Sequence, residues 1–175
     1  TDGRTWVQQE EVPFREFTSD YVWIYHPWMQ YAVTALSFAA LGASTFSARL
    51  PFVLAGLASV LLLYRLARQL QPELRMARLA AVLLALCVPS LLLARQCRYY
   101  AISAALTLLV LNSYFELGSA KRWSTPCFVL SSALLFHTEY AAFFPVMAAV
   151  TAHALLFQRT AGMWKKLLLN LALVA

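Results

Sequence analysis

Long hydrophobic runs alternate with short polar blocks along this chain of 175 residues. An apolar helix of roughly 20 residues can cross the hydrocarbon core of a bilayer. The candidate runs cover residues 49–66, 79–94, 101–117 and 127–157, and another begins near Leu167. The pattern therefore predicts an all-α fold, a polytopic bundle of transmembrane helices.

Two of these runs contain features that should bend or divide a helix. Pro89 lies inside the run over 79–94 and should kink it, because proline has no backbone N–H to donate. As one helix, residues 127–157 would be about 45 Å long, which exceeds one ordinary span. The polar sequence His-Thr-Glu-Tyr at residues 137–140 interrupts this run. We expect two short spans that meet there.

The first 48 residues have a different character. Residues 1–27 are polar and aromatic, which suits a loop lying at the membrane–water interface. Residues 28–43 are apolar but short, so they form either a short span or, as we favour, an interfacial helix that Gly42 ends. Residues 44–51 should form a break, with Pro51 in the first turn of the next helix. One domain over 1–175 then comprises an extracytoplasmic loop (1–48) and transmembrane helices (49–175).

The composition supports a membrane protein. Hydrophobic residues make up 61% of the chain and charged residues only 13%, whereas soluble domains carry about 25% charged residues. The net charge of +6 does not form a dense basic stripe. The basic residues flank the apolar runs, which predicts membrane lipids and not nucleic acid as partners.

The distribution of charge also predicts an orientation. If residues 1–48 lie outside and the spans alternate, the cytoplasmic side holds Arg65, Arg68, Arg75, Arg78, Lys121, Arg122, Arg159, Lys165 and Lys166. The outer side then holds Arg4, Arg15, Arg49, Arg95 and Arg98, and most of the acidic residues. Cytoplasmic loops of membrane proteins carry an excess of Lys and Arg, so this rule supports the proposed orientation of an integral, multi-pass protein.

Arg95 and Arg98 are exceptions to this rule, because they lie on the outer side between two hydrophobic spans. Ionisable residues at such a depth are costly and by default mark a functional site. Spaced i, i+3, they would share one helix face, just before the N-terminal end of the next span. Such a pair suits a phosphate, and Tyr99 and Tyr100 add hydroxyl donors. The alternative is that both arginines anchor span ends among lipid head groups.

Further polar residues are candidates on the same outer face. His137 and Glu139 could converge on a divalent cation or a sugar hydroxyl, or simply cap two short helices. His26 could hold a phosphate or a metal, or be an interfacial histidine. Asp20 is a candidate general base that spacing does not separate from the other loop carboxylates. Together these residues predict an outward-facing, arginine-lined cavity for an amphiphile with a phosphate head.

Other residues predict no chemistry. Cys87, Cys97 and Cys127 form no CxxC pair and have no metal-site spacing. We expect Cys87 and Cys127 to be small core residues, and His153 to be structural. The chain lacks an initiator Met and ends inside an apolar run, so we expect a fragment of a longer protein.

Three segments resemble membrane glycosyltransferases of the GT-C class, in particular the dolichyl-phosphate-mannose protein mannosyltransferase and aminoarabinose transferase group. The first contains His26-Pro27, Gly42 and Ala48-Arg49-Leu50-Pro51. The segment ARQCRYYA (94–101) resembles the family's Arg-x-x-Arg-x-Tyr element. The segment FHTEYAAFF (136–144) resembles its His-Thr-x-Tyr step. The order of the three elements makes the resemblance more specific than any one of them.

The resemblance implies a bundle of transmembrane helices with an extracytoplasmic catalytic cavity. It implies transfer of a sugar from a polyprenyl-phosphate carrier to a protein, lipid or glycan acceptor, with inversion at the anomeric carbon. A carboxylate would activate the acceptor hydroxyl, while arginines, and in some cases a divalent cation, stabilise the leaving phosphate. No metal site is assigned to particular residues.

One departure concerns the catalytic carboxylate. The family's Asp, often in Asp-Glu, lies at the start of the first outer loop, and we expect it upstream of this chain together with the first span. Asp20 is a weak substitute, and the fragment alone should be inactive. A transporter or flippase for an amphiphilic, phosphate-bearing solute would also need buried arginines. A purely structural membrane subunit would leave Arg95 and Arg98 unexplained.

Overall fold

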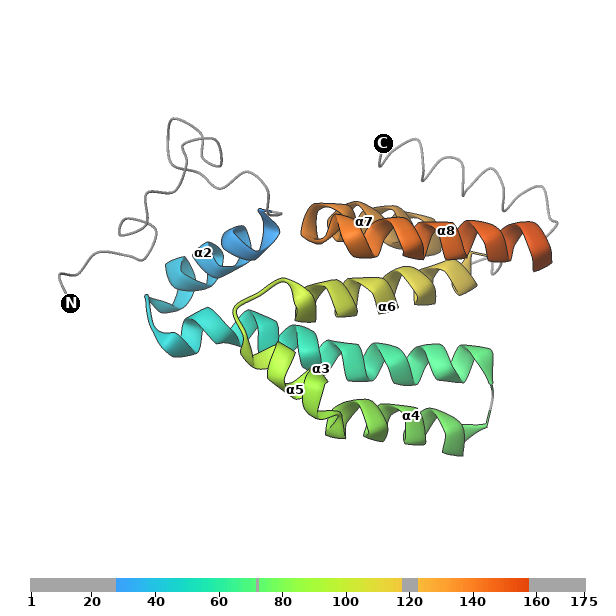
Figure 1. Ribbon diagram of the computed structural model, residues 1–175, viewed down its shortest axis with the longest axis horizontal. Coiled ribbons are helices and arrows are strands. Elements are labelled where there is room, and N and C mark those ends of the chain that lie inside the picture. The colour runs from blue at the N-terminus through green and yellow to red at the C-terminus, as the bar shows by residue number, and fades with distance from the viewer. Residues whose placement is uncertain (1–27, 72, 118–122, 158–175) are drawn as a thin grey trace.

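The computed structural model describes residues 28–71, 73–117 and 123–157, and every regular element in these ranges is an α-helix (Figure 1). The helices are α2 (Met29–Leu41), α3 (Thr45–Leu70), α4 (Leu74–Leu86), α5 (Val88–Arg95), α6 (Tyr100–Glu116), α7 (Ser124–Thr138) and α8 (Tyr140–Phe157). The predicted all-α membrane helix bundle is therefore confirmed. The predictions for residues 1–27 and for the last span lie outside the described residues.

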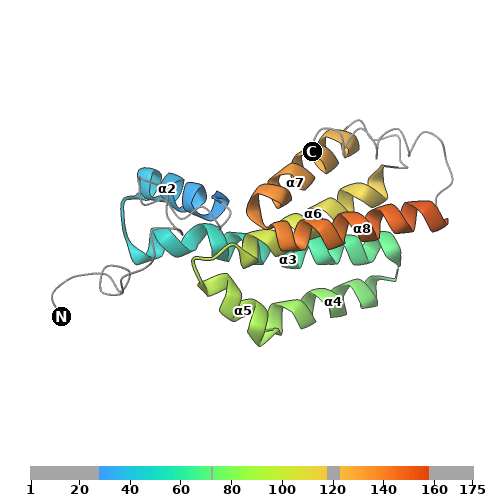
Figure 2. The same ribbon diagram turned by 45° about the horizontal axis from the view of Figure 1, so that its top comes forward.

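Helix α3 is the long central helix of the bundle. It lies between α6 on one side and the α4–α5 pair on the other (Figures 1 and 2). Its 26 residues correspond to about 39 Å, enough to cross a bilayer. By length and apolar composition, α3 and α8 are the candidate spans among the described residues, and α4 with α5 qualifies as a bent pair. That α6 and α7 also cross stays a prediction.

The connection between α2 and α3 is shorter than predicted. Ser44 and Ser47 form a reciprocal capping box that starts α3 at Thr45. Residues 45–51, expected as a break, are therefore helical, and Pro51 lies in the second turn instead of the first. Gly42 ends α2 as predicted, with a φ of +78° that favours glycine.

A serine of α2 compensates for the proline in α3. Pro51 has no N–H, so the carbonyl of Ser47 lacks its usual intrahelical donor. The Ser37 hydroxyl donates to that carbonyl at 2.6 Å. The fully buried Ser47 hydroxyl donates in turn to the carbonyl of Gly42 at 2.5 Å. These bonds fix α2 against the start of α3.

The predicted kink near Pro89 is a complete break. Helices α4 and α5 meet at Cys87 with a bend of 56°, and Figure 2 shows them as a V below α3. Pro89 occupies the first turn of α5, where its missing N–H costs no intrahelical bond. The bend returns the chain toward the start of α3.

The hydrophobic core lies between α6, α7 and α8. Its largest buried side chains include Tyr114, Phe128, Leu135 and Val150. The Tyr114 hydroxyl lies 2.8 Å from Nδ1 of His153, a contact that a structural role would produce; that role stays a prediction. The prediction for Cys127 was wrong, because its side chain is exposed on α7, and Cys87 is half-buried at the bend.

Candidate functional site

One end of the bundle collects the predicted site residues that the structure describes. The α5–α6 connection lies there beside the start of α3 (Figure 1). Helix α2 and the break between α7 and α8 lie at the same end. Arg95 is the last residue of α5, and Arg98 lies in the connection. We call this region the arginine end.

The prediction that Arg95 and Arg98 share a helix face was wrong. The helical hydrogen bonding of α5 ends at Arg95, and α6 begins only at Tyr100. A third arginine, Arg49 from the second turn of α3, joins them instead. The three side chains are exposed and line one open depression of about 550 Å³. The convergence comes from the fold and not from their spacing.

Arg49 was not predicted as a site residue. Its signal was present, since it was assigned to the outer side and belongs to the Ala-Arg-Leu-Pro element. The broken α4–α5 pair brings Arg95 back to the second turn of α3. This contact could not be predicted from the sequence. Among the described carboxylates, none forms an ion pair with Arg49, Arg95 or Arg98.

A second hollow of about 330 Å³ adjoins the depression and shares Cys97 and Arg98 with it. Tyr99 and Tyr100 line it from the start of α6, and Gln30 and Tyr31 line it from α2. Pairing of α2 with the connection is specific, because the Tyr99 N–H donates to Oε1 of Gln30 at 3.2 Å. Gln30 and Tyr31 were not predicted as site residues.

The two tyrosines form a hydrogen-bonded pair with ring centroids 4.4 Å apart. That hydrogen bond, together with partial burial and the negative charge of Glu139, raises the pKa of Tyr99 to about 12. The Tyr99 hydroxyl therefore stays protonated at physiological pH. The Arg98 guanidinium hydrogen-bonds to the Tyr100 hydroxyl, and Arg98 lines both hollows.

The break between α7 and α8 adds two polar residues to this end. Glu139 has an extended backbone between the helices and is close enough to Tyr99 to influence its pKa. His137 is exposed and packs against Trp28, at the start of α2, with ring centroids 5.7 Å apart. Asp20 and His26 lie outside the described residues. No three His, Cys, Asp or Glu side chains group as metal ligands within the described part of the chain.

A close approach of two helices positions Arg95. A Cβ added to Gly56 of α3 would lie 2.8 Å from Cβ of Ala94, closer than two such atoms can pack. Glycine therefore lets α5 lie directly on α3, one residue before Arg95. This contact holds one side of the arginine depression.

Comparison with known proteins identifies a family for this chain. A family model described as "Dolichyl-phosphate-mannose-protein mannosyltransferase" matches residues 25–175, which is most of the chain. The match covers every helix described above. No curated protein and no solved structure matches the chain.

Proposed function

Because this chain belongs to the dolichyl-phosphate-mannose-protein mannosyltransferase family, a family of membrane glycosyltransferases, we propose that it transfers a sugar from a polyprenyl-phosphate carrier. The acceptor is a protein, lipid or glycan on the extracytoplasmic side, and the arginine end lies on that side of a multi-pass protein. The chain would supply the part of the active site that holds the donor.

The convergence of three arginines that have no carboxylate partner among the described residues supports the proposal most strongly. Arg49, Arg95 and Arg98 line one depression, and guanidinium groups bind phosphate oxygens through paired N–H donors. Exposed leucines of α5, Leu91 and Leu92, precede this depression. An amphiphile could therefore lay its isoprenoid chain along α5 while its phosphate contacts the arginines.

In the proposed reaction, the acceptor oxygen attacks the anomeric carbon of the donor sugar. The bond from that carbon to the phosphate oxygen breaks, and its electron pair stays on the phosphate. The arginines stabilise this developing negative charge, which is the interaction that grows most toward the transition state. A carboxylate takes the proton of the acceptor hydroxyl, and Asp20 remains the candidate in this sequence. Glu139, Tyr99 and His137 would contact hydroxyl groups of the sugar or acceptor.

The experiment compares arginine variants of the full-length protein reconstituted in liposomes, with dolichyl-phosphate-linked mannose as the first donor. Arg98→Ala and Arg49→Ala should each lower transfer more than about tenfold, because a hydrogen bond to a charged group contributes about 1.5–3 kcal/mol. Arg75→Ala is the matched control, since Arg75 is equally exposed but lies in α4 at the opposite end.

Transfer by Arg98→Ala equal to that of Arg75→Ala would contradict the phosphate assignment. The assay contains no ion gradient and no nucleotide, so it also separates the enzyme from a transporter or flippase. Movement of the intact donor across the membrane, with no new glycosidic bond, would support that alternative.

A further inference from the structure

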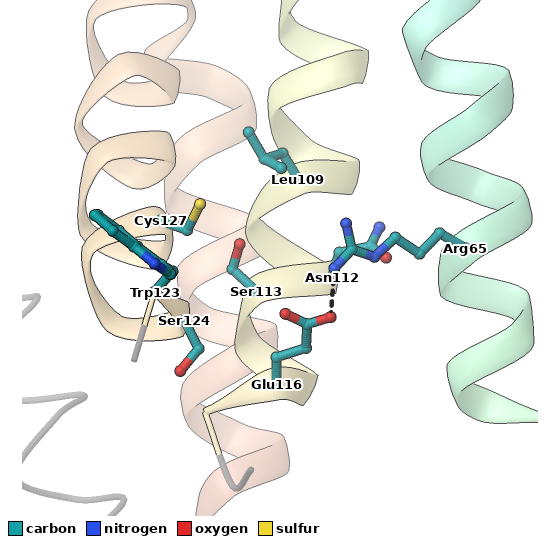
Figure 3. Close-up of a pocket in the computed structure, with 8 residues that line it drawn as sticks. All are labelled: Arg65, Leu109, Asn112, Ser113, Glu116, Trp123, Ser124 and Cys127. Carbon is teal, nitrogen blue, oxygen red and sulfur yellow. Dashed lines mark hydrogen bonds and ion pairs between the residues drawn. The ribbon is translucent and has the colours of Figure 1, made fainter. Parts of the chain in front are cut away.

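A second polar pocket lies at the opposite end of the bundle, between α3, α6 and α7 (Figure 3). Its volume is about 380 Å³. One stripe of α6 forms its floor, with Leu109, Asn112, Ser113 and Glu116 spaced i, i+3, i+4 and i+7. Arg65 reaches toward this stripe from α3, and Figure 3 shows Ser113 and Glu116 between it and α7.

Among the described residues that line the pocket, Arg65 and Glu116 carry one charge of each sign. The Arg65 guanidinium donates to Oε1 of Glu116 at 2.6 Å, and Gln69 donates to the same oxygen at 3.1 Å. The Arg65 side chain is still 54% exposed, whereas that of Glu116 is 16% exposed. Guanidinium has five N–H donors, so Arg65 can bind Glu116 and a ligand oxygen together.

Asn112, in the lining of the pocket, has a buried acceptor without a partner among the described residues. Its residue is only 2% exposed, and its amide nitrogen donates to the carbonyls of Leu62 and Leu108 at 3.0 and 2.7 Å. These two bonds fix the orientation of the amide. The Oδ1 atom is then buried without a hydrogen-bond partner among the described residues. A buried acceptor without a hydrogen-bond partner destabilises the folded protein, unless a donor occupies the pocket.

A stripe of exposed residues on α7 begins at the pocket and would suit an acyl chain. Trp123, Cys127 and Leu130 follow one another at i, i+4 and i+7 and are all exposed. Trp123 is 76% exposed at the mouth of the pocket, and tryptophan prefers the level of the head groups. An acyl chain that starts at Trp123 would run along this stripe toward Leu130.

We propose that this pocket binds a phospholipid whose head group carries both a phosphate and a primary ammonium, as in phosphatidylethanolamine. The phosphate contacts the free N–H groups of Arg65, and the ammonium donates to Glu116 and to Oδ1 of Asn112. A pocket of this size lies within the usual range of roughly 300–1,000 Å³ for small-molecule sites.

The charges of the pocket select against other head groups. An anionic head group would contact Arg65 but would be repelled by the carboxylate of Glu116. A choline head group has the right charges, but its nitrogen carries no N–H to donate to Asn112. The ethanolamine head group therefore satisfies Arg65, Glu116 and Asn112 at once.

The test measures lipid retention by the full-length protein, purified in detergent, with native mass spectrometry. Phosphatidylethanolamine, its mono- and dimethyl derivatives, phosphatidylcholine and phosphatidylglycerol are compared with identical acyl chains. We expect phosphatidylethanolamine to bind about tenfold more tightly than phosphatidylcholine or phosphatidylglycerol, which is equivalent to about 1.4 kcal/mol. Affinity should fall with each methyl group. Equal retention of all five lipids, or a preference for phosphatidylglycerol, would overturn the proposal.

Variants assign the selectivity to the pocket. Glu116→Gln should abolish the preference for phosphatidylethanolamine over phosphatidylglycerol, whereas Glu73→Gln, an exposed acid at the same end, should preserve it. A preference that survives in Glu116→Gln places the lipid elsewhere and refutes the assignment. If that variant does not fold, the methylation series on the unaltered protein still decides the question.

A competition with soluble phosphoethanolamine separates a lipid from a free metabolite. The proposal expects weak competition, because the acyl chain contacts the α7 stripe. Tight binding of the soluble compound, with no lipid selectivity, would refute a lipid ligand. The assay measures lipid binding and not sugar transfer, so its outcome is independent of the proposed function.

Discussion

The two ends of the bundle both present arginines, but they differ in what neutralises the positive charge. At the arginine end, Arg49, Arg95 and Arg98 have no carboxylate partner among the described residues. At the opposite end, Arg65 is paired with Glu116 at 2.6 Å. Uncompensated guanidinium groups favour a ligand with net negative charge, whereas a compensated pair favours a zwitterion.

The two ends also differ in how their residues come together. The opposite end uses a regular stripe on α6, and its geometry follows from helical periodicity. The arginine end depends on a helix break, a close helix contact and a short connection. Small backbone changes should therefore disturb the arginine end much more than the pocket at Arg65.

The largest effect should come from the contact between α3 and α5. Gly56→Ala places a Cβ where only 2.8 Å separates it from Cβ of Ala94, so α5 must move away from α3. Overpacking of this kind costs about 1–3 kcal/mol. Arg95, the next residue after Ala94, would be displaced with α5. We expect sugar transfer by the full-length protein to fall about tenfold, while retention of phosphatidylethanolamine at the opposite end is unchanged.

The matched control is the double variant Gly56→Ala with Ala94→Gly. It moves the methyl group from one helix to the other, which removes the steric conflict. Transfer should then recover most of its rate. If the double variant is as slow as Gly56→Ala alone, the close approach of α3 and α5 does not position the arginine site.

The sequence predicted the elements better than their junctions. Apolar runs located the seven helices of the described residues. Pro89 predicted a kink near one helix break, and residues 137–140 predicted the other. The connections between helices were harder to predict. A capping box determines where α3 begins, and the hydroxyl of Ser37, on another helix, compensates for Pro51. Such hydrogen bonds depend on how α2 folds back, which local periodicity does not encode.

The candidate site shows the same limit. Arg95 and Arg98 were identified because arginines between hydrophobic runs are costly. The argument that they share a helix face failed, since the helix ends at Arg95. Arg49 and Gln30 were missed because they come from segments 46 and 69 residues away from Arg95 and Tyr99, respectively. Only the tertiary fold brings such residues together.

A smaller effect should follow from loss of the hydrogen bond between α2 and α3. Ser37→Ala leaves the carbonyl of Ser47 without its donor at 2.6 Å, which should destabilise this junction by about 1 kcal/mol. Backbone amides of α2 should then exchange with deuterium faster, as hydrogen-exchange mass spectrometry can measure. Exchange in α7 should not change.

Thr34→Val serves as the control for the junction. Thr34 donates only to the carbonyl of Gln30 in its own helix, at 2.8 Å, so its loss should leave α2 attached to α3. Equal acceleration in Ser37→Ala and Thr34→Val would show that the hydrogen bond to Ser47 does not hold α2 in place.

The smallest effect concerns the only described carboxylate at the arginine end. The hydrogen bond to Tyr100, burial and the charge of Glu139 together raise the pKa of Tyr99 from 10.0 to about 12. A raised pKa means that the neutral phenol is favoured in the folded protein. Its stabilising contribution is therefore complete below pH 10 and is lost as the pH rises through about 12.

Glu139→Gln removes one cause of this shift, so the pKa of Tyr99 should move down toward its ordinary value. Absorbance at 295 nm follows tyrosine ionisation, and the difference between each protein and its Tyr99→Phe counterpart isolates this residue. Glu73→Gln, at the opposite end of the bundle, should leave the midpoint unchanged. A midpoint that stays the same in Glu139→Gln would place the carboxylate too far from Tyr99 to contact the same ligand. The arginine end would then bind the carrier phosphate without a described acidic residue beside it, and the search for the base would turn to Asp20.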